Sequence, residues 1–372
     1  MFRNSIPKSA FKAISDEFFA MSIYTQIAKR FKGDPLGVKF DEIARMEGEH
    51  AVFWRTFFEK RGYAAPSQIG KLKISFYDAV LRILGRGLTL RLMEMNESDA
   101  VDLYSGIVED RMLDGEEAEG LKKILEDELV HEQEFTREES RFEGFLAYVK
   151  DAVLGMNDGL VEILSVTTGL AGVYGNPFQV ALGGLIVGIA GALSMGISTY
   201  ASVRAQRQVQ EGVLNRIVKT SRYVAHVFKE RVAAHMLRKG YSERVSNAVA
   251  EESSKDHGML SDFIAAEEHG LRKEALGKPL KAGLYAGLFN AFGAFVPLLP
   301  YLFSPSIPAS VLMSLAFAGG ALAFTGSLIA VLANMHVKKK MVEMVFAGLI
   351  SAGATYLLGR AASLLLGVTA AY

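Results

Sequence analysis

The pattern of apolar and charged residues divides the chain near residue 150. Before this point, charged residues recur throughout, with apolar residues at helical spacing between them. Beyond it come five mostly apolar stretches of about 20 residues or more, long enough for a helix to cross a bilayer. The expected spans are 149–173, 178–202, 282–303, 309–333 and 343–368. The pattern predicts an all-α protein, with a soluble helical domain over 1–145 and a membrane domain over 146–372.

The charges between the spans predict their orientation. The links between spans one and two and between spans three and four carry no charge, whereas the insert at 203–281 holds 15 Lys and Arg and 338–340 is three consecutive lysines. Loops rich in Lys and Arg stay in the cytoplasm. With five spans, we expect the N-terminal domain and the helical insert in the cytoplasm, the C-terminus outside, and the protein in the inner (cytoplasmic) membrane. The first residues lack the apolar run of a secretory signal peptide.

Composition narrows the chemistry. The formal net charge is zero, so we expect no nucleic acid among the partners. The chain has no cysteine, which excludes disulfides, thiolate zinc sites, iron–sulfur clusters and a cysteine nucleophile. Any bound metal must therefore take Glu, Asp, His or Met as its ligands.

The soluble half contains an internal repeat. Its apolar spacing predicts four helices with one long connector, around 63–74, between the second and the third, which is a ferritin-like form of the four-helix bundle. The first and third helices each carry a Glu with a Tyr seven residues later, and the second and fourth each carry Glu-x-x-His. The two copies are Glu17, Tyr24, Glu47 and His50, then Glu97, Tyr104, Glu128 and His131.

This repeat has the ligands of a carboxylate-bridged di-iron or di-manganese bundle, in which two helices give one Glu each and two give Glu-x-x-His. Carboxylate oxygens and neutral imidazole suit Fe²⁺ and Mn²⁺, and the i, i+3 spacing brings Glu and His to one helix face. We expect two iron ions here, with manganese as the alternative metal. The competing interpretation is that four polar helix faces match by chance. The two tyrosines are expected to pack rather than to order ligands.

The same set resembles the rubrerythrin branch of the ferritin-like family, over residues 8–145. The resemblance implies a further ligand one turn before Glu97, where this chain has Glu94; a plain surface Glu is the alternative. Rubrerythrins also carry a four-cysteine iron centre, which this chain lacks. Electrons must then come from elsewhere or from substrate Fe²⁺, and ferroxidase or non-haem peroxidase activity is an open question.

The first expected span breaks the apolar rule, because it carries Asp158 and Glu162 on one helix face. Acids at membrane depth are costly and usually line a pathway or bind a cation. The alternative for Glu162 is a position near the end of the span, with its carboxylate reaching the interface. The second span contains Met195, and both spans contain a Gly-x-x-x-Gly pair, 155 with 159 and 184 with 188, that lets helices approach closely.

The stretches KDAVLGMNDGLVEILSVTTGLAG and GALSMGISTYASVRAQ, with FVPLLPYLF after the insert, resemble the vacuolar iron transporter family over 143–372. The resemblance implies five spans, a homodimer and movement of Fe²⁺ or Mn²⁺ out of the cytosol against protons, with Asp158 and Met195 on the ion path. We add Glu162 as a path candidate. Ile264 and Ala265 replace the Met pair of the family's metal-binding insert. The insert candidates, for which a solvated helix face is the alternative, are Glu211, Glu267, Glu268 and His269.

A ferritin-like domain joined to such a membrane domain is similar to the membrane-bound ferritins of prokaryotes. Three hypotheses for the function follow. The first is an exporter fed with Fe²⁺ by the bundle, the second is a membrane-anchored enzyme that oxidises Fe²⁺ with O₂ or H₂O₂, and the third is a metal-sensing dimerisation module on a transporter. The expected partners are Fe²⁺, Mn²⁺, protons, the lipid bilayer and a second copy of the chain.

Overall fold

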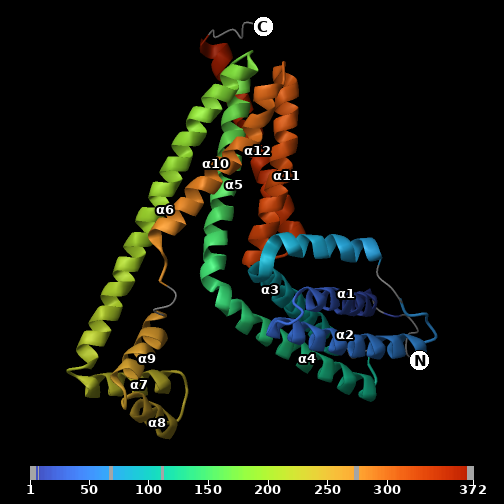
Figure 1. Cartoon of the computed structure of the whole chain (residues 1–372), viewed down its shortest axis with the longest axis vertical. Coiled ribbons are helices and arrows are strands. Elements are labelled where there is room, and N and C mark those ends of the chain that lie inside the picture. The colour runs from blue at the N-terminus through green and yellow to red at the C-terminus, as the bar shows by residue number, and fades with distance from the viewer. Residues whose placement is uncertain (1–5, 7, 67–69, 110–112, 272–275, 367–372) are drawn as a thin grey trace. The chain divides into compact units, whose positions relative to one another are not determined.

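The chain is helical wherever the structure describes its regular elements, which confirms the all-α prediction. The computed structural model describes residues 6, 8–66, 70–109, 113–271 and 276–366. The chain forms two compact units, Met1–Leu146 with Val331–Asn334, and Ala147–Ala330 with Met335–Tyr372 (Figure 1). Parts of the predicted connector, third helix, insert and last span lie outside the described residues, at 67–69, 110–112, 272–275 and 367–368.

The first unit is the predicted four-helix bundle. Its helices are α1 (Lys8–Arg30), α2 (Pro35–Lys60), α3 (Lys71–Glu109) and α4 (Gly115–Glu139). α1 pairs with α2 and α3 pairs with α4, as in a ferritin-like bundle. Residues from all four helices, among them Ile14, Trp54, Tyr104 and Leu121, share one buried apolar cluster. Burial of this cluster holds the two hairpins together.

Local signals set the starts of the two helices that carry Glu-x-x-His. Asp34 caps α2 by accepting a hydrogen bond from the Leu36 N–H at 2.9 Å. Asp114 and Glu117 form a capping box at the start of α4. Glu117 also accepts two hydrogen bonds from Arg61, at 2.6 and 2.8 Å. Since Arg61 directly follows α2, these bonds tie the start of α4 to the end of α2.

α3 is longer than expected, because it begins inside the predicted connector. Gly85, with φ 71° and ψ −178°, divides α3 into a first part, residues 71–84, and the part that carries the predicted ligands. A positive φ of this kind suits glycine. We call residues 71–84 the arm. It is held on α1 by an ion pair between Asp78 and Arg30.

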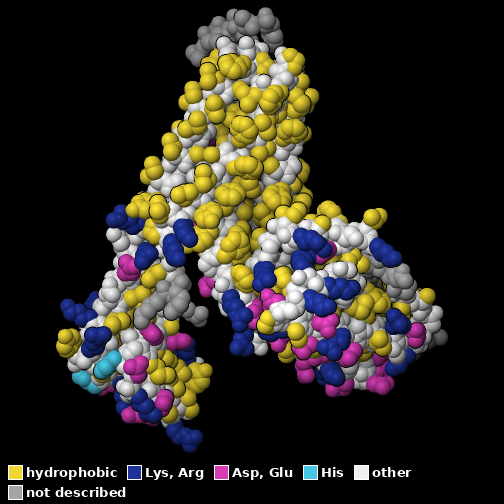
Figure 2. Space-filling view, in the orientation of Figure 1, with side chains coloured by type: hydrophobic (Ala, Val, Ile, Leu, Met, Phe, Trp, Pro, Cys, Tyr) yellow, Lys and Arg dark blue, Asp and Glu magenta, His cyan; other side chains and the backbone are white. Residues whose placement is uncertain are grey.

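The second unit contains the predicted membrane helices. They are α5 (Glu143–Ala171), α6 (Pro177–Ser221), α10 (Pro279–Phe303), α11 (Ile307–Leu332) and α12 (Val337–Leu366). Four of them, α6, α10, α11 and α12, are long and apolar enough to cross a membrane. On the face shown in Figure 2, apolar side chains gather over the upper part of these helices. α5 does not meet this criterion, so the count of five spans is not confirmed. A 3₁₀ turn, Ser140–Phe142, separates α4 from α5.

Between α6 and α10 lies the predicted helical insert. Its helices are α7 (Ala225–Arg238), α8 (Glu243–Ser253) and α9 (His257–His269). α6 continues without a break from the apolar stretch into the insert and shares an apolar core with it, which includes Leu214, Val232 and Ile264. Ile264 occupies a position of the methionine pair in the family that the membrane half resembles, and it is fully buried in this core.

Candidate metal centre

The predicted ligands converge inside the bundle. Each of the four helices gives at least one of them. All are at most 3% exposed: Glu17, Glu47, His50, Glu97, Glu128 and His131. Burying ionisable side chains is costly unless they are paired or bind a metal, so this arrangement requires a physical reason.

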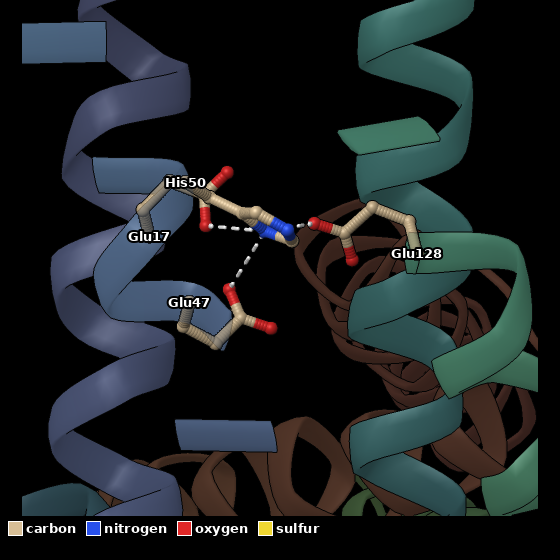
Figure 3. A group of neighbouring side chains, drawn as sticks. All are labelled: Glu17, Glu47, His50 and Glu128. Atoms are coloured by element: carbon tan, nitrogen blue, oxygen red, sulfur yellow. Dashed lines mark ion pairs between the residues drawn. The ribbon is translucent and has the colours of Figure 1, made fainter. Parts of the chain in front are cut away.

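These side chains form two groups that share two members. In the first group, the ligand atoms of four residues lie within 4.8 Å of one another: Glu17, Glu47, His50 and Glu128. The second group meets the same limit: Glu47, Glu97, Glu128 and His131. Figure 3 shows the first group, with the ring of His50 facing the three carboxylates. Sharing two carboxylates between two groups is the arrangement that two neighbouring ions need.

The shared carboxylates are oriented as bridges. Glu47 places Oε2 3.9 Å from His50 Nδ1 and Oε1 3.5 Å from His131 Nδ1. Glu128 places Oε1 3.3 Å from His50 Nδ1 and Oε2 3.8 Å from His131 Nδ1. Each shared carboxylate therefore turns one oxygen to each group.

The terminal carboxylates complete the groups. Glu17 Oε2 lies 3.5 Å from His50 Nδ1, and Glu97 Oε2 lies 3.6 Å from His131 Nδ1. These separations fit a cation with ligands at about 2.1 Å, because two such ligands lie roughly 3 to 4 Å apart. Several of the atoms are buried without a hydrogen-bond partner: Glu17 Oε2, Glu47 Oε1, His50 Nδ1 and both ring nitrogens of His131. Since native proteins rarely leave buried polar atoms unpaired, the donor set fits a pair of cations and is compatible with a di-iron site.

Two tyrosines hold the terminal carboxylates, so the expectation that they only pack is wrong. Tyr24 on α1 donates a hydrogen bond to Oε1 of Glu97 on α3. Tyr104 on α3 donates to Oε1 of Glu17 on α1. The two bonds cross between the helices and follow the internal repeat. Each fixes the orientation of a carboxylate whose other oxygen faces a histidine, as partners of metal ligands commonly do.

Asp127 on α4 is a candidate that the sequence analysis missed. Its Oδ2 lies 3.3 Å from His50 Nε2, so the carboxylate holds the ring with Nδ1 turned toward the first group. The equivalent position in the other copy, directly before Glu47, is Met46. The internal repeat is therefore asymmetric here. In the sequence, the only signal was an acid directly before a predicted ligand.

Burial and mutual contact shift the pKa values in the cluster. Burial, with neighbouring carboxylates adding to it, raises the pKa of Glu47 well above its ordinary value and that of Glu97 to about 8. Burial alone would lower the pKa of the histidines, but the nearby carboxylates, first of all that of Glu128, outweigh it. They raise the pKa of His50 to about 10 and that of His131 to about 9. At neutral pH the metal-free cluster therefore binds more protons than the same side chains would bind in water, and a cation must displace them.

Glu94, the implied exchanging ligand, is buried but lies outside both groups. Its Oε2 accepts a hydrogen bond from Arg91 at 2.9 Å, and Arg91 also reaches Glu139 at 3.4 Å. Burial raises the pKa of Glu94, and Arg91 opposes this shift. The arginine holds the carboxylate in this structure, and a ligand role for Glu94 stays a prediction.

A cavity of about 370 Å³ opens beside the cluster. Four of the ligand carboxylates line it: Glu17, Glu47, Glu97 and Glu128. Two exposed acids, Asp16 and Asp99, and the arm residues Lys73 and Tyr77 also contribute to its lining. The cavity gives small solutes access to the carboxylates, and its acids favour cations.

In the second unit, two of the predicted path residues, Asp158 and Glu162, lie on α5, and the third, Met195, lies on α6. A Cβ built on Gly191 of α6 would lie 2.7 Å from Oε2 of Glu162, so Glu162 rests against α6. α5 and α6 run antiparallel. Asp158 precedes Glu162 by one turn on α5, and Met195 follows Gly191 by one turn on α6, so we expect Asp158 and Met195 at the same level of the two helices. Asp158 and Glu162 are exposed in the single chain, and Met195 is half-buried. The three residues stay candidates for an ion path.

The first Gly-x-x-x-Gly pair lies at a close helix contact. A Cβ on Gly155 would lie 2.3 Å from the carbonyl oxygen of Ala286, and one on Gly159 would lie 2.1 Å from that of Asn290. Both neighbours belong to α10. Side chains larger than hydrogen are excluded from these two positions, because the backbones of α5 and α10 touch there.

The insert candidates do not join a metal group in the part of the chain that the structure describes. Three of them form ion pairs with basic residues: Glu211 with Arg207, Glu267 with Lys239 and Glu268 with Arg231. The fourth, His269, is the last residue of α9. The ion pairs favour the solvated-face interpretation of these residues.

The fold and the site together define a multi-pass membrane protein with a buried carboxylate–histidine cluster in an N-terminal helical bundle. The rubrerythrin family model matches residues 11–139, and the VIT family model matches residues 149–360. Because the second match covers more than half of the chain, the protein belongs to the VIT family. One polypeptide therefore joins a rubrerythrin-type domain to a VIT membrane domain, as the likeness to membrane-bound ferritins implies.

Three named relatives each align with more than half of the chain. "Vacuolar iron transporter 1" of Tulipa gesneriana is 24% identical over 213 residues, which cover 57% of this chain and 86% of that protein. The protein of the same name from Arabidopsis thaliana is 24% identical over 212 residues, covering 57% and 85%. "Protein CCC1" of Saccharomyces cerevisiae is 23% identical over 216 residues, covering 56% and 67%.

Proposed function

We propose that this protein exports Fe²⁺, and Mn²⁺ through the same ligand chemistry, from the cytosol in exchange for protons, and that its bundle captures the ion on the cytoplasmic side. The observation that carries the proposal is the buried carboxylate–histidine cluster in a chain that also has acids on a helix of its membrane domain. The acids are Asp158 and Glu162, and together with Met195 of α6 they are the candidates for the ion path. Relatives of the membrane part bear the name vacuolar iron transporter, which supports iron as the cargo.

The orientation rests on α5 acting as a fifth span. Gly155 of α5 packs on the backbone of α10, and a Cβ on Gly359 of α12 would lie 2.1 Å from the carbonyl oxygen of Gly169 of α5. Both neighbouring helices have the length and composition of spans, which supports α5 at membrane depth. The bundle, the insert and the lysines at 338–340 then share one side, which the positive-inside rule assigns to the cytoplasm. The membrane is the inner, cytoplasmic membrane of the cell.

Exposed carboxylates on α5 support a homodimer. Leu154, Asp158 and Glu162 lie exposed along one helix face in the single chain. Acids at membrane depth face protein or water rather than lipid. A second copy that covers this face encloses the carboxylates in a shared ion path. Carboxylates that release a metal cation take up protons, which provides the exchange of metal ions for protons.

Within the bundle, the chain's own residues would hold the ions. The shared carboxylates Glu47 and Glu128 span both positions, while Tyr24 and Tyr104 keep the terminal carboxylates in place. The cavity beside them admits Fe²⁺ as cargo. Binding displaces protons from the two histidines, so capture is favoured as the cytosol becomes less acidic.

The test is transport by the full-length protein in proteoliposomes that contain a dye quenched by Fe²⁺ or Mn²⁺. Asp158→Asn keeps the size of the side chain and removes its charge, so we expect most of the flux to be lost. The matched control is Glu251→Gln, which removes a carboxylate that pairs with Lys229 on the insert surface, and it should transport at the wild-type rate. Equal flux through Asp158→Asn and the wild type would show that the proposed path is wrong. A proton gradient that opposes the flux should slow it.

The complete ligand set and its cavity also favour a second function, oxidation of Fe²⁺ by O₂ or H₂O₂ at the bundle. Asp158→Asn separates the two functions, because it leaves the bundle unchanged. If the bundle is a ferroxidase, this variant still forms Fe³⁺ at the wild-type rate, and Glu47→Gln does not. Metal binding without Fe³⁺ formation would remove the enzyme hypothesis. A change of oligomeric state in Glu17→Gln would then favour a sensing role.

A further inference from the structure

The arm carries an apolar stripe that is uncovered in the part of the chain that the structure describes. Leu72, Phe76 and Ile83 are 88%, 71% and 84% exposed, and Ala79 between them is exposed as well. Steps of four, three and four residues place these side chains on one helix face, and we call them the arm stripe. The opposite face of the arm packs on the bundle through the fully buried Leu81. Exposed apolar patches of this kind mark interaction surfaces.

Basic residues border the arm stripe on both sides. At 100° per residue, Lys71 and Arg82 fall on one side of it and Lys73 on the other. The one acid in the arm sequence, Asp78, is paired with Arg30 and Arg82. An apolar face flanked by Lys and Arg is typical of a helix that lies in the interface of an anionic bilayer.

The arm ends beside the segment that leads into the membrane domain. A Cβ built on Gly87, just past the arm, would lie 3.2 Å from the ring of Phe145 and 3.3 Å from Cβ of Phe142, all within one compact unit. Phe145 belongs to α5 and precedes the start of the first expected span, at 149, by a helical rise of about 6 Å. The chain itself therefore keeps this end of the arm close to a membrane surface.

We propose that the arm is an interfacial helix that lies in the surface of the bilayer, with the arm stripe among the acyl chains and the bordering basic residues at anionic headgroups. Lipid covers the stripe, because the chain spans a membrane, the arm ends on residues next to a span, and its basic border matches anionic lipid. Lys73 and Tyr77 of the arm also line the cavity beside the metal cluster. One wall of the route to the cluster is thus anchored to the membrane surface.

Depth-dependent quenching in the full-length protein tests this proposal. The chain has no cysteine, so Phe76→Cys and Ile83→Cys each take up one environment-sensitive fluorophore. The variants are placed in nanodiscs of phosphatidylcholine and phosphatidylglycerol. We expect lipids with a nitroxide on the acyl chain to quench both labels several-fold more than aqueous iodide does. The matched controls Val38→Cys and Val52→Cys, 60% and 56% exposed on α2, should show the reverse.

Charge and folding controls complete the test. Lys71→Glu should weaken lipid quenching of the label at position 76, whereas Lys123→Glu, an equal charge change on the exposed face of α4, should not. The fluorescence of Trp54 shows that the bundle of each variant is folded. Iodide quenching of the arm labels as strong as that of the α2 labels would overturn the proposal. Labels shielded from both quenchers would overturn it too, because protein, either a second copy or the membrane domain, would then cover the stripe.

Discussion

Glu97→Gln should change the stability of the bundle in opposite directions without and with metal. Burial raises the pKa of Glu97 from its ordinary value of 4.5 to about 8. A carboxyl group with a higher pKa in the folded state contributes stability that is complete below pH 4.5 and is lost as the pH rises toward 8. At about 1.4 kcal/mol per pH unit, the loss for this one group reaches about 3 kcal/mol at pH 7.

Glutamine preserves the contacts of the protonated carboxyl group. Its carbonyl oxygen can accept the hydrogen bond of Tyr24, and its amide can donate to Glu128. Since glutamine does not ionise, the metal-free variant should be about 3 kcal/mol more stable than the wild type at pH 7 and equally stable at pH 4.5. For a domain of this size, that is a rise of about 10 °C in the unfolding temperature. With excess Mn²⁺ the order reverses, because the variant has lost a charged ligand.

Tryptophan fluorescence isolates the bundle in the full-length protein. Trp54 is the only tryptophan in the sequence, is fully buried and stacks on Tyr104 at 5.9 Å between ring centroids. Unfolding is followed between pH 4.5 and 7, with EDTA or with Mn²⁺. The control Glu49→Gln changes an exposed carboxyl group on α2 and should match the wild type throughout. If metal-free Glu97→Gln is no more stable than the wild type at pH 7, or gains as much from Mn²⁺, the reasoning is refuted.

Three further outcomes are expected. Glu17→Gln should leave about one of two ions per chain and Glu47→Gln should weaken the binding of both, because Glu47, unlike Glu17, turns an oxygen to each group. Equal ion counts by elemental analysis would contradict this. Mn²⁺ must displace protons from the two histidines, whose pKa values lie at about 10 and 9, so its affinity should rise by about tenfold per pH unit for each proton displaced. An Mn²⁺ affinity that does not change between pH 6 and 8 would contradict this. Gly159→Ala should destabilise the membrane domain by about 1 to 3 kcal/mol, because the added Cβ meets a backbone oxygen at 2.1 Å. The control Gly353→Ala, whose Cβ has no neighbour within 4 Å, should not. Thermal denaturation in detergent compares the two variants.

The candidate ligands could be predicted from the sequence because their constraints are local and occur twice. The i, i+3 spacing of Glu47 and His50 sets a helix face without any knowledge of the fold. Its repetition at Glu128 and His131 made chance agreement a poor explanation. The bridging geometry of the two shared carboxylates could not be predicted in this way, because it depends on how far apart the helices lie and how they are rotated.

Contacts between helices explain the errors. Whether Tyr24 packs or donates depends on Glu97, which is distant in sequence and comes close only after α1 and α3 pair. The sequence of α4 does not distinguish Asp127 from a solvated acid, because its contact with the ring of His50 forms only when α2 and α4 pack together. The sequence predicted no helix over the arm, whose first residues fell in the expected connector. Its apolar residues supply two faces, one for the bundle and one exposed, which weakens a simple helical pattern.

The shared carboxylates also have a consequence for how the bundle is assembled. The hairpin of α1 and α2 supplies three members of the first group and one of the second, and the hairpin of α3 and α4 does the converse. Neither hairpin can therefore complete an ion site alone, and a cation bound at either group joins the two halves. Ion uptake by a newly made chain then reports that its hairpins have docked in register, and it slows their separation afterwards.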